Sequence, residues 1–208
     1  MPELACPVEP PQDRIMFIAL LLAVAIAPAA QDASPQKLFE SGKYQEAIDL
    51  VKKSSDAPSD QVYVRALAHR KLNQNDDAKD AFGALSGRDG VWKEIGTSGT
   101  AFIEGKMDDA AAAARRAVDA DGNSAQARFQ LGLVESARNN QQQAADAFAK
   151  ATELDPQMAY AHYEAGMAFY KAKKVDRMAV YFENFLRLAP NAPEKPAVQS
   201  IMKTIRGR

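Results

Sequence analysis

The stretch RFQLGLVESARNNQQQAADAFAKATELDP, residues 128–156, is followed by a second stretch of the same pattern, HYEAGMAFYKAKKVDRMAVYFENFLRLAP, residues 162–190. The two align without a gap at an offset of 34 residues. In each, apolar residues recur at helical spacing on both sides of a short polar break, which predicts two amphipathic helices joined by a turn. A fixed period of this length indicates a chain built from repeated helix–turn–helix units.

Small and large residues occupy fixed columns of this pattern. The small residues of the second helices are Ala47, Ala78, Ala110 and Ala144, with Met178 in the last unit. The residues four positions later are Val51, Phe82, Ala114, Phe148 and Phe182. The matching small residues of the first helices are Ala66, then Ser98 or Gly99, then Gly132 and Gly166. Two antiparallel helices approach closely only where one has little side chain, and the partner's ring fills the space beside it.

These columns resemble those of the tetratricopeptide repeat, a helix–turn–helix unit of 34 residues. The resemblance covers roughly residues 33–190 and is weakest in the first unit, whose opening helix is cut short at Ser34-Pro35. It implies an all-α fold, a right-handed α-solenoid of antiparallel helix pairs with about five units. Turn signals agree, because Gly42, Gly105 and Asn139-Asn140 tolerate the left-handed conformation that ends a helix.

A short helix is expected after the last unit. Val198, Ile201, Met202 and Ile205 have the spacing of one apolar helix face within residues 193–206. A solenoid exposes the apolar side of its last repeat, which a terminal helix covers. We therefore expect a repeat domain over 30–190 and a C-terminal capping helix over 191–208. The alternative is that this basic helix lies on a membrane surface.

An uninterrupted apolar run, Ile15–Ala27, leads into the small residues Ala27-Pro28-Ala29. The run is typical of a secretory signal peptide and falls short of the ~20 apolar residues of a transmembrane helix. We expect residues 1–29 to be a signal peptide cleaved near Ala29, which would place the mature protein in the periplasm or outside the cell.

The residues ahead of this run leave alternatives open. Arg14 is outnumbered there by three acidic residues, although a signal peptide usually begins with a basic region. Translation starts at either Met1 or Met16. The leader is alternatively an uncleaved membrane anchor or a buried helix. Cys6, the one cysteine, leaves with a cleaved leader, so the mature chain would suit an oxidising compartment.

The charge of the chain is balanced overall and uneven along its length. Twenty-six basic residues face 27 acidic ones, net −1, which argues against a nucleic-acid-coating protein. Residues 30–167 hold 16 basic and 21 acidic residues, whereas residues 168–208 hold nine basic and three acidic ones. The chain therefore has an acidic body and a basic C-terminal end.

No group of residues predicts catalysis or a cofactor. One cysteine and two histidines, His69 and His162, are too few for a typical zinc or iron–sulfur site, and the histidines suit helix packing. GTSGT at 96–100 has the second glycine of a nucleophile elbow one position too early, and the Ser-x-x-Lys pairs at 34–37 and 200–203 lack their companion motifs. We expect neither enzymatic activity nor a bound metal or cofactor. A solenoid-type envelope hydrolase is the distant alternative.

The resemblance implies that the first helices of successive units line a concave groove that takes a peptide or another protein. The residues projected onto that face are Tyr63, Leu67, Trp92, Ile95, Phe129, Leu133, Tyr160, Tyr163, Met167 and Tyr170, with Lys171 beside them. Tyrosine is enriched in binding hot spots. Some of these residues, Phe129 and Leu133 above all, alternatively belong to the core between repeats.

The chaperone-binding members of this family hold a C-terminal carboxylate with a lysine–asparagine clamp. The corresponding positions here are Phe129, Leu133, Tyr163 and Met167, so that activity is not expected. The sequence favours a non-catalytic exported adaptor that binds a protein or peptide partner. The alternative is a structural cell-envelope component held at a membrane by its leader or its basic end.

Overall fold

The computed structural model describes residues 34–52 and 56–207, and the predicted leader lies outside these ranges. The described part is all-α and contains eleven helices. Their bounds are α1 Pro35–Glu40, α2 Tyr44–Lys52, α3 Ser59–Lys71, α4 Asn75–Ser86, α5 Val91–Ile103, α6 Met107–Ala120, α7 Ala125–Ala137, α8 Gln141–Leu154, α9 Ala159–Lys171, α10 Val175–Leu188 and α11 Lys195–Arg206.

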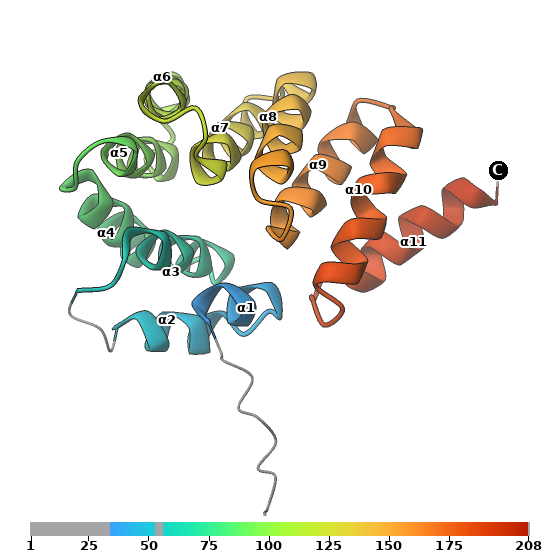
Figure 1. The fold of residues 1–208 in the computed structure, drawn as a ribbon, viewed down its shortest axis with the longest axis horizontal. Helices are drawn as coiled ribbons and strands as arrows, with labels where there is room; N and C mark the ends of the chain where they lie inside the picture. The colour runs from blue at the N-terminus through green and yellow to red at the C-terminus, as the bar shows by residue number, and fades with distance from the viewer. Residues whose placement is uncertain (1–33, 53–55, 208) are drawn as a thin grey trace, which may run out of the picture. The chain divides into compact units, whose positions relative to one another are not determined.

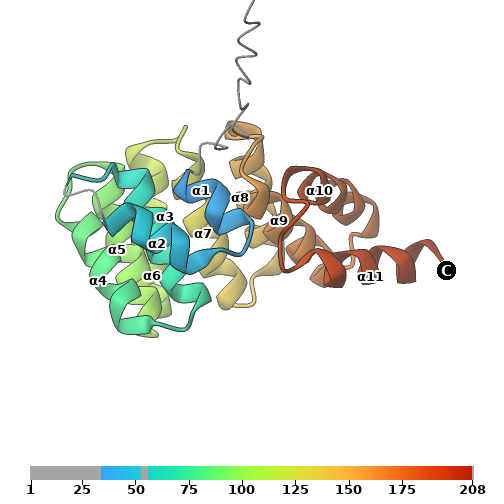
Figure 2. The same ribbon diagram turned by 90° about the horizontal axis from the view of Figure 1, so that it is seen from below.

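The helices pack as consecutive antiparallel pairs, from α1–α2 to α9–α10, with α11 following the last pair. Successive pairs follow a curved row, as Figure 1 shows from α3 through α10. The curve brings α1 between α3 and α9 in both Figure 1 and Figure 2. The predicted solenoid of about five helix pairs, with a truncated first helix, is confirmed.

Contacts between glycine and phenylalanine hold the regular units together. A Cβ atom at Gly132 would lie 2.6 Å from the ring of Phe148, and Gly166 faces Phe182 in the same way one repeat later. Any larger residue at either glycine would force the two helices apart. Both phenylalanines are fully buried, so each close approach is filled by one ring.

In the third unit, the structure shows whether Ser98 or Gly99 is the small residue of the first helix. Ser98 occupies the column of Gly132 and Gly166, and its Oγ donates a hydrogen bond to the backbone oxygen of Ala110 at 2.9 Å. Gly99 instead faces the ring of Phe82 from the preceding unit. The two neighbouring small residues therefore serve two different contacts, one within the unit and one between units.

The turn inside each pair contains one residue with a left-handed backbone. Three of the five were predicted, Gly42, Gly105 and Asn139, and the structure adds Asn73 and Lys173. In each turn the next residue donates a backbone hydrogen bond to the residue five positions back, as Lys174 does to Phe169 at 2.9 Å. This is the hydrogen-bond pattern of the Schellman motif. The turn geometry thus repeats even where the sequence lacks a glycine or asparagine.

The predicted C-terminal helix forms as α11 and packs its apolar face on the preceding helices. Val198 and Met202 are buried, and Ile201 and Ile205 are half-buried. The described helices include none that is both long enough and apolar enough to cross a membrane.

Candidate functional site

Two adjoining cavities lie between α3, α7 and α9 on the inner side of the curve. Their volumes are about 200 and 220 Å³. They share four wall residues, Phe39, Leu67, Phe129 and Tyr160. We call the two cavities together the concave groove. Its walls come from the first helices of four units, because α1 contributes Phe39.

The two ends of the concave groove carry different charges. Asp60 and Asp155 line the first cavity, whereas Arg70, Lys71 and Glu164 line the second. Burial raises the pKa of the Glu164 carboxyl, and the positive charges of Lys71 and Arg70 oppose that rise. A segment of mixed charge with an apolar centre would complement this arrangement.

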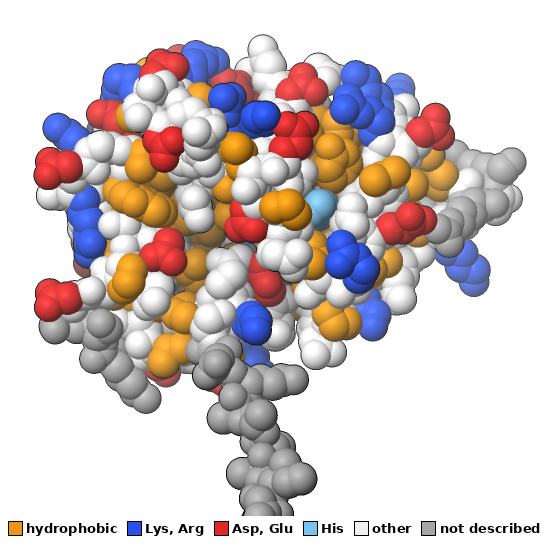
Figure 3. Space-filling model, viewed as in Figure 1, with side chains coloured by type: hydrophobic (Ala, Val, Ile, Leu, Met, Phe, Trp, Pro, Cys, Tyr) orange, Lys and Arg blue, Asp and Glu red, His pale blue; other side chains and the backbone are white. Residues whose placement is uncertain are grey.

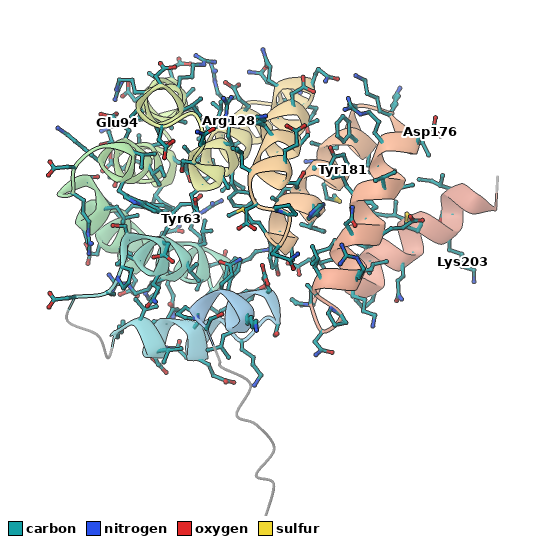
Figure 4. All side chains as sticks on the ribbon, viewed as in Figure 1. Tyr63, Glu94, Arg128, Asp176, Tyr181 and Lys203 are labelled. Carbon is teal, nitrogen blue, oxygen red and sulfur yellow. The ribbon has the colours of Figure 1, made fainter. Side chains whose placement is uncertain are left out.

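Five of the predicted groove residues line these cavities: Tyr63, Leu67, Phe129, Leu133 and Tyr160. Tyr63, Phe129 and Tyr160 are walls of the concave groove, but each side chain is buried, with 1%, 4% and 2% of its surface exposed. Tyr63 points to the inner side of the curve (Figure 4), and the centre of its ring lies 6.2 Å from that of the Trp92 ring. A partner would therefore touch only their edges, and their role in binding stays a prediction.

The other predicted residues lie outside both cavities. Tyr163 is half-buried with its ring 5.1 Å from that of Phe185, and burial raises its pKa to about 12. Tyr170 is 43% exposed and lines a separate shallow hollow beside Ile201 and Ile205 of α11. The tyrosines of α9 thus face two different parts of the surface.

The four remaining predicted positions also lie outside both cavities. Ile95 is fully buried, Trp92 and Met167 are half-buried, and Lys171 is exposed. Figure 3 shows hydrophobic side chains in small groups between interspersed acidic and basic ones on the face it presents. The eleven predicted residues are therefore divided among the cavity walls, the core and other parts of the surface, and their role in binding stays a prediction.

A buried polar chain behind the groove wall was not predicted. The Tyr63 hydroxyl donates to Gln130 Oε1 at 3.1 Å, and Gln130 Nε2 donates to Ser98 Oγ at 3.1 Å. Ser98 in turn donates to the backbone of Ala110, so the chain joins α3, α7, α5 and α6. The sequence did offer one signal for this chain of hydrogen bonds. Gln130 lies on the apolar face of a predicted helix, and a buried amide side chain needs hydrogen-bond partners.

Both histidines have packing roles, as expected. His69 is buried with its Nδ1 2.7 Å from Gln74 Oε1. His162 Nε2 lies 3.1 Å from the backbone oxygen of Pro156, and burial lowers the pKa of His162. Within the described residues, no three or more histidine, cysteine, aspartate or glutamate side chains are placed to hold a metal ion.

Contacts between distant helices lie beside the concave groove. The Tyr160 hydroxyl donates to Glu194 Oε2 at 2.7 Å and lies 3.1 Å from the hydroxyl of Tyr44. Glu194 also pairs with Lys71 Nζ at 2.7 Å, and that ammonium lies 4.6 Å from the centre of the Tyr160 ring. We call Tyr44, Lys71, Tyr160 and Glu194 the closure cluster. It joins α2, α3, α9 and the segment before α11.

Part of the chain matches the model of a known protein family, and several solved structures have a similar fold. Residues 100–159 and 129–193 match the tetratricopeptide repeat family model. No curated protein matches the sequence.

Three solved structures share the fold at low sequence identity. TTC0263, a thermophilic TPR protein of Thermus thermophilus, is 16% identical, with 82% of this chain and 94% of that chain covered and a TM-score of 0.59. YrrB, a TPR protein with an unusual peptide-binding site, is 19% identical, with 80% and 88% covered and a TM-score of 0.51. The first TPR of Spaghetti (RPAP3), solved with an HSP90 peptide, is 19% identical, with 56% and 95% covered and a TM-score of 0.52.

These matches agree with the helix pairs, the glycine–phenylalanine columns and the repeated turns described above. Residues 100–193 therefore match the tetratricopeptide repeat, and the described helices have the fold of a tetratricopeptide-like solenoid.

Proposed function

We propose that this protein is a non-catalytic adaptor that binds a segment of a protein partner in the concave groove. The observation that carries the proposal is the pair of adjoining cavities between α3, α7 and α9, with a shared apolar wall and charged ends. Clefts that combine apolar walls with a few placed polar groups are the usual form of a binding site.

The charges at the two ends suggest how such a segment would lie. Its basic or amino-terminal part would meet Asp60 and Asp155, and its acidic part would meet Arg70, beside Lys71 and its partner Glu194. Charge complementarity of this kind selects partners and sets their direction more than it adds affinity. The peptide-binding site of YrrB and the peptide bound to RPAP3 support a peptide ligand for this fold.

The test uses two leucines that receive the same substitution. Leu133 is half-buried and lines the second cavity, whereas Leu50 is 38% exposed on α2 and lines neither cavity. Immobilised wild-type protein is used to capture partners from an extract of the source cells. We expect a partner that is retained by wild type and Leu50→Arg and lost by Leu133→Arg, with both variants folded by circular dichroism. Equal retention by the two variants would place the working surface elsewhere.

We further propose that the adaptor is exported. This proposal rests on the apolar run Ile15–Ala27 and the small residues that follow it. The intact mass of the protein recovered from its native cells should correspond to a chain that begins at Ala30, within one or two residues. Recovery of the uncleaved chain in the cytosol would contradict export, and recovery of the uncleaved chain in the membrane would favour the anchored alternative.

A further inference from the structure

The first helix of the protein differs from the other first helices of the solenoid. The helices α3, α5, α7 and α9 have 13 residues each, whereas α1 has six. Isolated helices this short are unstable in water, so α1 keeps its shape through a cap and through its packing. The cap is Ser34, whose hydroxyl accepts a hydrogen bond from the Lys37 amide, and Pro35 occupies the first turn.

One aromatic side chain of α1 stands in the concave groove. Phe39 lines both cavities and is 3% exposed. Its ring centre lies 4.8 Å from that of Tyr160 on α9 and 5.4 Å from that of Tyr44 on α2. Leu67 and Phe129 complete the wall around the same space. Phe39 therefore lies where the two cavities meet, among the apolar residues at the centre of the groove.

The next residue places a carboxylate at the start of α9. The N-cap of α9 is Met158, which has no side-chain acceptor for the free amides of the first turn. The amide of Ala159 donates instead to Glu40 Oε1 at 3.2 Å, and Gln36 Nε2 donates to the same oxygen at 2.7 Å. A helix N-terminus favours a negative charge, so Glu40 supplies the cap that α9 lacks.

We propose that α1 is an internal ligand of the concave groove. A partner would enter by displacing α1, and it would present the same pair, an aromatic side chain directly followed by a carboxylate. The second statement rests on the proposed function, whereas the occupancy of the groove by α1 is tested without any natural partner.

The experiment supplies α1 as a separate molecule. The probe is a fluorescein-labelled peptide of residues 34–43, SPQKLFESGK, titrated by fluorescence anisotropy. The acceptors are the full wild-type chain and the full chain with Phe39→Ala and Glu40→Ala, which weaken its own α1. A tethered segment competes at an effective concentration of about 1 mM, so the peptide should bind the double variant at least ~10-fold tighter than wild type.

Two controls make the result specific. A peptide with Phe39→Ala should not bind either protein, and the labelled peptide should bind an equally folded Leu50→Arg chain as weakly as it binds wild type. Equal affinity for wild type and the double variant would overturn the proposal. Binding that is insensitive to the loss of the peptide's phenylalanine would also overturn it.

Hydrogen–deuterium exchange on the wild-type chain tests the proposal even if the double variant does not fold. If α1 is a displaceable ligand, the amides of residues 37–41 and of Ala159 exchange with deuterium by local opening, faster than the other amides of α5 to α10. Exchange of α1 only through global unfolding would contradict the proposal. A negative result here with loss of partner binding in Leu133→Arg would leave the adaptor function standing and remove only the internal ligand.

Discussion

The fifth and the first units of the solenoid share one pattern but depend on different contacts. In the fifth unit, Gly166 of α9 faces Phe182 of α10, so the decisive contact lies within the repeat. In the first unit, Phe39 and Glu40 contact Tyr160 and Ala159 across the concave groove. The comparison teaches that a complete repeat is stabilised by its own columns, whereas the truncated one adds contacts across the concave groove to those with its neighbours α2 and α3.

The largest expected effect is the loss of a ring from a complete unit. Phe182→Ala should lower the free energy of unfolding by about 3–5 kcal/mol, because a fully buried ring leaves a cavity against Gly166. Urea denaturation followed by circular dichroism measures the change. A loss below about 1 kcal/mol would mean that the column does not determine the stability of the unit.

A smaller loss is expected on the glycine side of the same contact. Gly166→Ala should cost roughly 1–3 kcal/mol, since the added Cβ would collide with the Phe182 ring. Gly122→Ala is the matched control, because a Cβ there would meet only the Val118 backbone oxygen, at 3.9 Å. If urea denaturation gave the two variants the same free energy of unfolding, α9 and α10 would accommodate the added Cβ without loss of stability.

The first unit should respond differently to the loss of its ring. Phe39→Ala should lower global stability by only about 1 kcal/mol, because α1 can detach while the remaining units stay folded. Hydrogen exchange should show loss of protection at the Ala159 amide and little change at the other amides of α7 to α10. A global loss as large as that of Phe182→Ala would make α1 an integral part of the core and would remove the contrast between the two units.

A turn residue gives a small stabilising prediction. Lys173 has a backbone φ of 60°, which a residue with a side chain adopts only at a cost. Lys173→Gly should raise the free energy of unfolding by roughly 0.5–1 kcal/mol. Gly105→Lys, in the equivalent turn of the third unit, should lower it by a similar amount. Thermal or urea denaturation of both variants that gave the same sign would contradict this explanation.

The smallest expected effect is a pH dependence of the first unit. Burial raises the pKa of Glu40 above 4.5, with the Gln36 and Ala159 hydrogen bonds acting against the rise. The native state therefore binds more protons than the unfolded state, and this contribution to stability is lost as pH rises through the native pKa.

The matched variant isolates this contribution. Glu40→Gln keeps an oxygen acceptor for the Ala159 amide but does not titrate. The stability of the variant relative to wild type should increase from pH 4.5 upward and level off above the native pKa. Glu164, whose pKa is also raised, is present in both proteins, so its contribution cancels in the difference. A difference that does not vary with pH in urea denaturation would contradict the assignment to Glu40.

Much of the fold was predictable because neighbouring repeats specify each other. The offset of 34 residues placed Gly132 and Gly166 against Phe148 and Phe182, and the apolar spacing placed α11. The left-handed turn at Lys173 was not predictable from residue type, since lysine does not favour it. There the packing of α9 on α10 determines the turn.

The candidate site was less predictable, because a column on a helix does not reveal the depth of its side chains. Tyr63 and Tyr160 were predicted as groove residues and do line it, but each is buried, with its hydroxyl bonded to Gln130 or Glu194. Tyr170, predicted on the same face, instead lines a hollow beside α11.

The sequence by itself determined the helix–turn–helix unit, its period, the close helix contacts and the capping helix, because all of these depend on residues near one another in the chain. Only the tertiary structure decided what occupies the concave side. The contact between Glu40 and the Ala159 amide joins residues 119 positions apart. It exists because the small rotation between successive pairs accumulates along the row until the truncated α1 meets α9, and no local pattern encodes that sum.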